Sequence, residues 1–177
     1  MKAGNDLDHI FVISDHHFCS YKLPSFFQVF SQEQEKELID KWNSIVSKDD
    51  LVYYNGDFCD GNVVELCNYA KLLNGQIILV RGNHDIFNNN LYRAVFKDVV
   101  DEVVLDKLDL TIHHCPGPCS TKHEVFGHLH RGKPMQNIAK TSCRFCSCVQ
   151  SNDGYPVSLK KIVDTFHYDL FRTSNPT

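Results

Sequence analysis

Aspartate, asparagine and histidine residues gather in five short clusters between residues 15 and 130 of the chain. The clusters are Asp15-His16-His17, Gly56-Asp57, Asn83-His84-Asp85, His113-His114 and Gly127-His128-Leu129-His130. Carboxylate, amide oxygen and imidazole together suit Mn²⁺, Fe²⁺, Zn²⁺ or Ni²⁺, and are too rich in nitrogen for Ca²⁺. Seven or more such groups exceed the need of one ion and suit two ions held about 3.5–4 Å apart.

Each cluster follows a short apolar run that is typical of a buried strand. These strands are predicted at residues 9–14, 51–54, 76–80, 108–112 and 124–126, with further strands at 99–105 and 143–149. Ligands in open α/β sheets bind beyond the carboxyl ends of the strands, so neighbouring strands would bring the clusters to one place. Gly56, Gly82 and Gly127 stand at these strand ends, where glycine permits a sharp turn and close backbone approach.

Helical segments alternate with the first strands. Helices are predicted to begin after Ser31, Asn62 and Asn88, and a last one runs from Ser158 to about Phe166. The first two have Gln or Glu three residues after the cap residue, as a capping box requires. The first half is thus βαβαβ and the second half mostly strands, which predicts one α/β domain over residues 1–177, with two packed sheets and helices outside.

The net charge and the composition argue against several classes of partner and predict the cellular compartment. The net charge of −4 gives no general attraction to nucleic acid or to an anionic membrane. No apolar run is long enough to span a bilayer, and the first residues lack the apolar stretch of a secretory signal, so we expect a cytoplasmic protein without a membrane partner. In such a compartment free thiols are expected for the eight cysteines.

The cysteines leave one structural alternative open. Cys115 with Cys119, and Cys143 with Cys146 and Cys148, could supply the four ligands of a structural zinc ion. The spacing matches no regular zinc finger or ribbon, and buried thiols are the simpler interpretation.

The ordered motifs as a set carry a family resemblance. They are Asp15-x-His17, Gly56-Asp57, Gly82-Asn83-His84-Asp85, His114 and Gly127-His128-x-His130. From about residue 9 to residue 132 the chain resembles the calcineurin-like metallophosphoesterase superfamily, and in particular its small single-domain bacterial and phage members. The resemblance implies an α/β fold of the metallo-dependent phosphatase type, a four-layer αββα sandwich of two mixed β-sheets flanked by helices.

The resemblance also implies a set of metal ligands. One cation would be held by Asp15, His17, Asp57 and His130, and the other by Asp57, Asn83, His114 and His128. Asp57 would bridge two divalent ions, for which Mn²⁺ is the first expectation and Zn²⁺, Fe²⁺, Ni²⁺ or Mg²⁺ are alternatives.

Two adjacent histidine pairs require a choice. Neighbouring residues of an extended segment point opposite ways, so His17 is preferred to His16 as the partner of Asp15. The family pattern places the other ligand two residues before a proline, which favours His114 over His113.

The remaining motif residues receive catalytic or substrate-binding roles. The two cations would activate a water molecule whose hydroxide attacks phosphorus, and His84 would protonate the leaving oxygen. Asp85 would orient an imidazole or be only a turn residue. Asn83, His84, Arg81 and Arg131 would bind the substrate phosphate, although solvated arginines remain the alternative.

The expected substrate is a phosphodiester, or a phosphomonoester, of a small nucleotide-like molecule. No arginine stands soon after Asp57 and Asp60, where the resemblance implies that protein Ser/Thr phosphatases of the superfamily would have one. The sequence shows nothing that resembles an added cap domain, and its net charge is negative, so we do not expect a long nucleic acid as the substrate. The alternatives are a nuclease acting on single-stranded or RNA ends and a non-catalytic metal-binding scaffold. Aromatic residues after the first motif would line a base-stacking pocket or belong to the core: Phe18, Tyr21, Phe26, Phe27 and Phe30.

Overall fold

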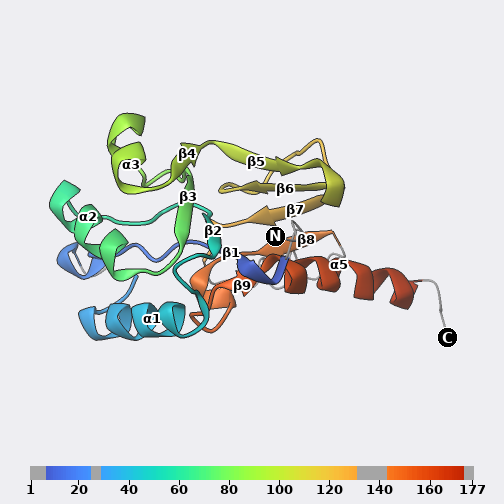
Figure 1. The fold of residues 1–177 in the computed structure, drawn as a ribbon, viewed down its shortest axis with the longest axis horizontal. Coiled ribbons are helices and arrows are strands. Elements are labelled where there is room, and N and C mark those ends of the chain that lie inside the picture. The colour runs from blue at the N-terminus through green and yellow to red at the C-terminus, as the bar shows by residue number, and fades with distance from the viewer. Residues whose placement is uncertain (1–6, 25–28, 131–142, 174–177) are drawn as a thin grey trace.

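Two mixed β-sheets form the centre of the computed structural model, which describes residues 7–24, 29–130 and 143–173 (Figure 1). The first sheet has the order β4-β3-β2-β1-β9 and consists of β1 (Ile10–Ile13), β2 (Leu51–Tyr54), β3 (Gln76–Val80), β4 (Asp98–Val100) and β9 (Val157–Ser158). The second has the order β5-β6-β7-β8 and consists of β5 (Glu102–Leu105), β6 (Leu110–His113), β7 (His123–Phe126) and β8 (Arg144–Cys146). Neighbouring strands are parallel except for β9 beside β1 and β5 beside β6.

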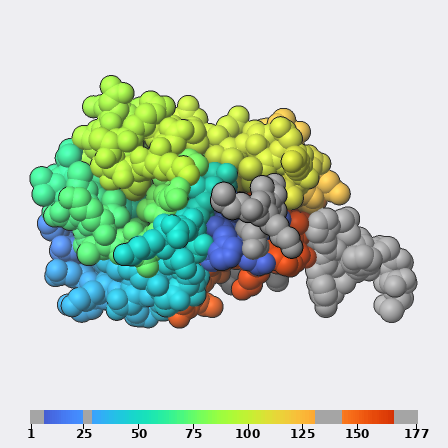
Figure 2. Space-filling view, in the orientation of Figure 1, coloured from blue at the N-terminus to red at the C-terminus, as the bar shows by residue number. Residues whose placement is uncertain are grey.

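Helices connect the parallel strands of the first sheet and lie together on one side of it (Figure 1). They are α1 (Gln32–Ile45), α2 (Val63–Leu72) and α3 (Asn89–Val95), and α5 (Leu159–Thr173) follows β9. Short 3₁₀ turns cover Leu7–His9, Ser20–Lys22, Asp106–Leu108 and Val149–Ser151. In the space-filling view the blue-to-green helical part adjoins the yellow part that carries β5 and β6 (Figure 2). Within the described residues, no helix is both long and apolar enough to cross a membrane.

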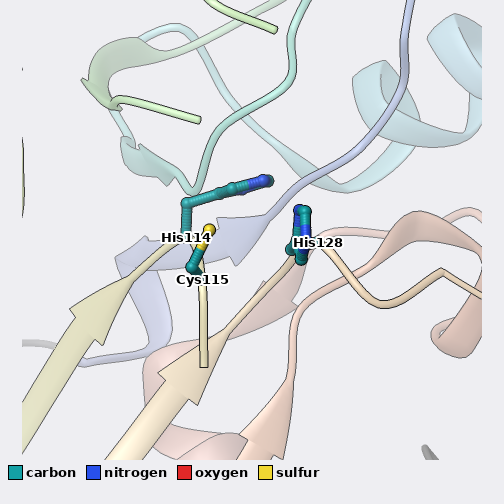
Figure 3. A group of neighbouring side chains, drawn as sticks. All are labelled: His114, Cys115 and His128. Carbon is teal, nitrogen blue, oxygen red and sulfur yellow. The ribbon is translucent and has the colours of Figure 1, made fainter. Parts of the chain in front are cut away.

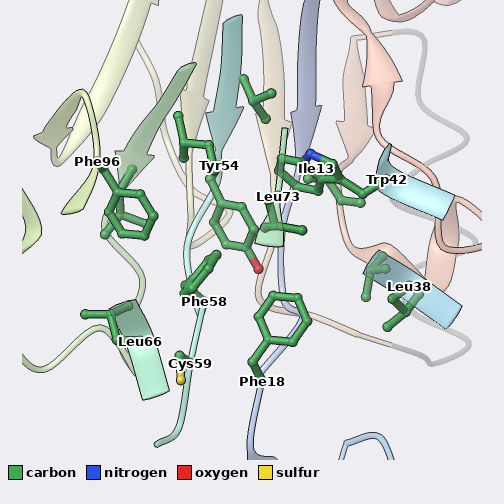
Figure 4. Packing of buried hydrophobic residues seen from close by; sticks show 14 of the residues in the cluster. Ile13, Phe18, Leu38, Trp42, Tyr54, Phe58, Cys59, Leu66, Leu73 and Phe96 are labelled. Atoms are coloured by element: carbon green, nitrogen blue, oxygen red, sulfur yellow. The ribbon is translucent and has the colours of Figure 1, made fainter. Parts of the chain in front are cut away.

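The alternating side chains of β1 separate two hydrophobic cores. Phe11 and Ile13 face the helices and join a core that contains the fully buried Trp42 of α1 (Figure 4). Val12 faces the second sheet and joins Ile112 and other residues between the two sheets, including the α5 side chains Ile162 and Phe166. The period of two residues therefore attaches the helical layer to one face of the sheet and the second sheet to the other.

Strand register brings the polar clusters to one edge of the molecule. Ile13 of β1 pairs with Tyr54 of β2, and Tyr54 pairs with Leu79 of β3, so these strands end level with one another. The same is true of β6 and β7, where His113 pairs with Phe126. The sheets are joined just beyond β1 by a backbone hydrogen bond of 3.0 Å from Ser14 N to Ser147 O.

The predicted α/β class with two mixed sheets and flanking helices is confirmed, and two local predictions are corrected. Residues 99–105 do not form one strand: Val99 and Val100 belong to β4 of the first sheet, residues 102–105 form β5 of the second, and the chain crosses between the sheets at Asp101. The charged residues Asp101 and Glu102 interrupt the apolar run at this crossing. Ser158 ends the two-residue strand β9, which the sequence analysis missed, and α5 extends to Thr173.

The capping box of α1 supplies a test of the helical layer. Ser31 Oγ accepts a hydrogen bond from Gln34 N, and the Gln34 side chain accepts one from Ser31 N. We expect Ser31→Ala to lower the free energy of unfolding, measured by urea denaturation, by about 1 kcal/mol because the backbone N–H of Gln34 loses its hydrogen-bond acceptor. Ser44→Ala near the other end of α1, where the hydroxyl only bonds back to Lys41 O, should change it by less than about 0.5 kcal/mol. Equal effects of the two substitutions would contradict the capping account.

Candidate metal centre

Four predicted ligands form one half of the centre. Metal-ligating atoms of Asp15, His17, Asp57 and His130 all lie within 4.8 Å of one another. His17 Nε2 lies 3.2 Å from His130 Nε2 and 3.5 Å from Asp57 Oδ2, and His130 Nε2 lies 3.5 Å from Asp15 Oδ1. Atoms bound to one ion at about 2.0–2.2 Å lie roughly 2.8–3.6 Å apart, so the spacing fits a shared cation.

The other half shares Asp57. His114 Nε2 lies 3.1 Å from Asp57 Oδ2 and 3.2 Å from Asn83 Oδ1. The imidazole of His128 stands edge-on to that of His114, with 5.2 Å between ring centroids (Figure 3). Asp57 thus faces both groups of imidazoles, which is the position of a bridging carboxylate.

A neighbouring group fixes the ring orientation of three of the histidines through Nδ1. His17 Nδ1 lies 3.0 Å from Asp60 Oδ2, and His114 Nδ1 lies 2.8 Å from the carbonyl oxygen of Asn55. His130 Nδ1 lies 3.2 Å from the side-chain amide of Gln150. With Nδ1 engaged as a donor to these oxygens, His17 and His114 present an unprotonated Nε2 to a cation, which is the form that binds metal.

The backbone at the centre is strained. Positive φ angles occur at five of the predicted ligands, namely Asp15 (64°), His17 (47°), Asp57 (59°), His128 (69°) and His130 (45°). A residue with a Cβ pays roughly 1–3 kcal/mol for such a conformation and keeps it only where the surroundings enforce it. The surrounding loops do so through backbone bonds such as Asp15 N to Gly56 O (3.0 Å) and His17 N to Asp57 O (3.1 Å).

Glycine leaves the space into which the ligands point. A Cβ on Gly82 would lie 2.2 Å from Asp57 Oδ1, and one on Gly127 would lie 2.7 Å from Asp15 Oδ2. Gly56 has a φ of 88°, and a Cβ there would lie 2.3 Å from His114 Nδ1. Any larger residue would displace a predicted ligand. The sequence analysis expected only a sharp turn and close backbone approach at these glycines, and the structure adds this steric role.

The pKa values of Asp57 and His114 are both shifted far from their ordinary values. Burial alone would raise the pKa of Asp57, but the hydrogen bond and charge of His114 outweigh it and lower the pKa to about 2. Burial alone would lower the pKa of His114, whereas its hydrogen bond to Asp57 and the charges of Asp15 and Asp57 raise it to about 9. In the metal-free chain the proton on His114 therefore supplies the positive charge that a cation would otherwise provide.

The donor set fits the pair of divalent cations that the fold family implies. Carboxylate and imidazole atoms converge at ligand spacing, the imidazoles are oriented from behind, and glycine keeps the space open. Asp15, His17, Asp57 and His130 would hold one cation, and Asp57, Asn83, His114 and His128 the other.

Asp60 is the residue that the sequence analysis missed. Its two carboxylate oxygens contact two imidazoles, with Oδ2 3.0 Å from His17 Nδ1 and Oδ1 2.9 Å from His84 Nδ1. Burial would raise the pKa of Asp60, but its hydrogen bonds to His17 and His84 and their charges lower it, so the carboxylate stays ionised. The sequence offers one indication of this role, a second aspartate three residues after Asp57.

Contacts of Asp85 and Arg81 differ from the expected ones. Asp85 orients no imidazole: its carboxylate accepts bonds from the backbone N–H groups of Asp57 (2.9 Å), Phe58 (3.1 Å) and Gly82 (2.8 Å), and so ties two ligand loops together. The Arg81 guanidinium donates to Asp85 O and to Asn89 Oδ1 within its own loop rather than facing the centre. Arg131 lies outside the described residues.

The choices between neighbouring histidines agree with the geometry. His16 is buried among aromatic side chains, 2.8 Å from the Tyr54 hydroxyl, and burial followed by the charge of His17 lowers its pKa to about 3. His113 pairs with Glu124 at 2.6 Å on the far side of the second sheet. Both are therefore outside the ligand set.

The structure argues against two open alternatives, a base pocket lined by Phe18 and a zinc site made of the described cysteines. Phe18 is fully buried in the helix-side core, stacked on Tyr69, so it does not line a base pocket. Phe30 packs partly against the same core, and residues 26 and 27 lie outside the description. Among the described side chains no group of cysteines has the spacing of a zinc site; the grouped thiol is that of Cys115, with His114 and His128.

Comparison with known proteins agrees with these features. The family model "calcineurin-like phosphoesterase" matches residues 9–144. An uncharacterised protein of Methanocaldococcus jannaschii is 37% identical over 83 residues, which cover 44% of this chain and 47% of that protein, so the match spans about half of the relative. A crystal structure of a protein of unknown function from Aquifex aeolicus superposes with a TM-score of 0.67 at 19% identity, over 86% of this chain and 96% of that chain, and shows the same fold.

The space around Gly82 gives a steric prediction. Gly82→Ala should weaken binding of Mn²⁺, measured by isothermal titration calorimetry, and lower the free energy of unfolding by about 1–3 kcal/mol, because the new methyl group occupies the position of the Asp57 carboxylate. The matched control is Gly117→Ala, whose Cβ would lie 4.0 Å from its nearest neighbour, Cys115 O. Unchanged Mn²⁺ affinity in Gly82→Ala would show that the close approach is unnecessary.

The charge state of His114 gives a pH prediction. Its pKa in the metal-free fold is raised to about 9 from 6.5, so the charged form stabilises that fold fully below pH 6.5 and this contribution is lost as the pH rises through 9. A cation must displace the same proton, so metal affinity should rise with pH by up to about tenfold per unit and level off above pH 9. Calorimetry in buffers of different ionisation enthalpy measures the released proton; absence of proton release at pH 7 would contradict the assignment.

Proposed function

This chain belongs to the calcineurin-like phosphoesterase family, and from that premise we propose that it hydrolyses the phosphodiester or phosphomonoester of a small nucleotide-like substrate with two divalent cations. At the coarser level it is a metal-dependent phosphoesterase. The observation that carries the finer proposal is Asp57, whose carboxylate faces imidazoles on both sides within 3.5 Å. A carboxylate so placed suits a bridge between two ions.

The proposed ligands form two groups that share the carboxylate of Asp57. When bound, the two cations neutralise charge on the phosphate oxygens and activate water, and Mn²⁺ is the first ion to test. Asp15, His17 and His130 hold one position, Asn83, His114 and His128 the other, and Asp57 joins them. Asp60, Asn55 and Gln150 hold the imidazole rings in orientation from behind.

His84 is the proposed proton donor. Its backbone N–H donates to Asp57 Oδ1 at 2.8 Å, which fixes the residue beside the bridging carboxylate. Its ring is 47% exposed and is held through Nδ1 by the ionised Asp60. Nε2 is therefore the free nitrogen, and its proton passes to the leaving-group oxygen as the P–O bond breaks. The carboxylate of Asp60 holds the ring in orientation through Nδ1 during that transfer.

Charge supports a small substrate. The chain has a net charge of −4, and Arg81 donates to its own loop rather than facing the centre. A long nucleic acid gains most of its affinity from phosphate contacts with basic side chains, which this surface does not favour. A nucleotide-sized ester depends mainly on the cations and on His84 for recognition.

The test compares His84→Ala with the wild-type chain on an aryl phosphodiester and an aryl phosphomonoester in the presence of Mn²⁺. We expect kcat to fall about 10²- to 10⁴-fold while bound metal, measured by elemental analysis, is unchanged. His9→Ala is the matched control, because His9 is also an exposed imidazole next to an aspartate, with Nδ1 2.7 Å from Asp50 Oδ1, but lies away from the centre. Full activity in His84→Ala, or turnover of single-stranded nucleic acid alone, would refute the proposal.

A further inference from the structure

A cysteine thiol stands at the second cation position. Cys115 follows His114 directly, and its Sγ lies within 4.8 Å of a ring nitrogen of His114 and of a ring nitrogen of His128. The sulfur and the two imidazoles point toward one another from the loops after β6 and β7 (Figure 3). Cys115 is also exposed, so the thiol can reorient without disturbing a packed core.

Two members of this group, Cys115 and His128, have side chains that are not engaged in hydrogen bonds within the described residues. Within the described part of the chain, neither the Cys115 thiol nor the His128 imidazole makes a hydrogen bond. The contrast lies close by: the Cys119 thiol donates to Thr121 O at 3.4 Å, and the imidazole of His113 is paired with Glu124. Cys115 and His128 are thus available to bind a metal ion, whereas Cys119 and His113 form hydrogen bonds that stabilise the fold.

The distances suit one shared ion after a small movement. A cation such as Zn²⁺ binds sulfur at about 2.3 Å and imidazole nitrogen at about 2.0–2.1 Å in tetrahedral geometry, so sulfur and nitrogen on one ion lie roughly 3.6 Å apart. The upper limit of 4.8 Å on the separations within this group exceeds that value by about 1.2 Å. Rotation about the single Cα–Cβ bond of an exposed cysteine covers such a difference.

We propose that Cys115 is a further ligand of the second cation and makes the two metal positions chemically different. The inference rests on the two positions of the proposed function. The first position offers only oxygen and nitrogen donors, whereas the second adds sulfur, which favours softer ions such as Zn²⁺, Co²⁺ or Cd²⁺ over Mn²⁺. As the bond from sulfur to the ion forms, the thiol releases its proton to solvent.

Cobalt provides a direct spectroscopic test. Metal-free wild-type protein is titrated with Co²⁺ alone, and the near-ultraviolet absorption from sulfur-to-cobalt charge transfer is recorded. We expect this absorption in the wild type and in Cys119→Ser, the matched thiol of the same loop, and its loss in Cys115→Ser. An equal absorption in Cys115→Ser, or none in the wild type with both positions filled, overturns the inference.

A second measurement needs no variant. Iodoacetamide should alkylate Cys115 in the metal-free wild type, and saturating Cd²⁺ should slow that reaction at least about tenfold, as read by mass spectrometry of the peptide. Alkylation at the same rate with and without Cd²⁺ overturns the inference.

Turnover on the same samples separates this inference from the proposed function. Charge transfer without phosphoesterase activity supports the thiol ligand and refutes the proposed function. Activity without charge transfer at full Co²⁺ occupancy refutes the thiol ligand and leaves the proposed function standing.

Discussion

Negative charge concentrated at one point of the protein is the constraint on which the site depends. Asp15 and Asp57 are almost completely buried, and Asp60 lies beside them behind the ring of His17. Ionised carboxylates so close together and so poorly hydrated require a positive partner. In the metal-free fold the partner is the proton on His114. The imidazole nitrogens at ligand spacing around the same carboxylates indicate that cations are the partner in the working protein.

The rest of the architecture holds this unfavourable arrangement in place. Parallel strands that end level deliver the ligand loops to one edge, and backbone bonds between the loops after β1 and β2 continue the pairing beyond the strands. Asp85 binds three backbone N–H groups and thereby connects the loops after β2 and β3. Positive φ angles at five ligand residues are the conformational cost of aiming their side chains inward. The hydrophobic cores on both faces of the first sheet supply the stability that offsets this cost.

Residue types and strand periodicity were sufficient to predict the two-sheet fold and which polar clusters converge, because both follow from local patterns that the strands impose. Three features could not be predicted in this way. The crossing between sheets lies at Asp101, where two charged residues interrupt an apolar run, and such an interruption does not reveal that the flanking strands belong to different sheets. Asp60 reaches His17 and His84 only through the pairing of the loops that follow β1 and β2. Arg81 binds an atom of its own loop and Asp85 binds backbone N–H groups of the loop after β2, and no spacing in the sequence distinguishes either from a contact with substrate.

The central claim is that one carboxylate joins two cation positions, and metal stoichiometry tests it most directly. Metal-free protein is saturated with Mn²⁺, freed of unbound ions, and analysed for ions per chain in the wild type and in Asp57→Asn. The account predicts about two ions in the wild type, as in dinuclear phosphatases, and a large loss of both in the variant, because both positions share Asp57. At most one ion in the saturated wild type, or full metal content in Asp57→Asn, would contradict it.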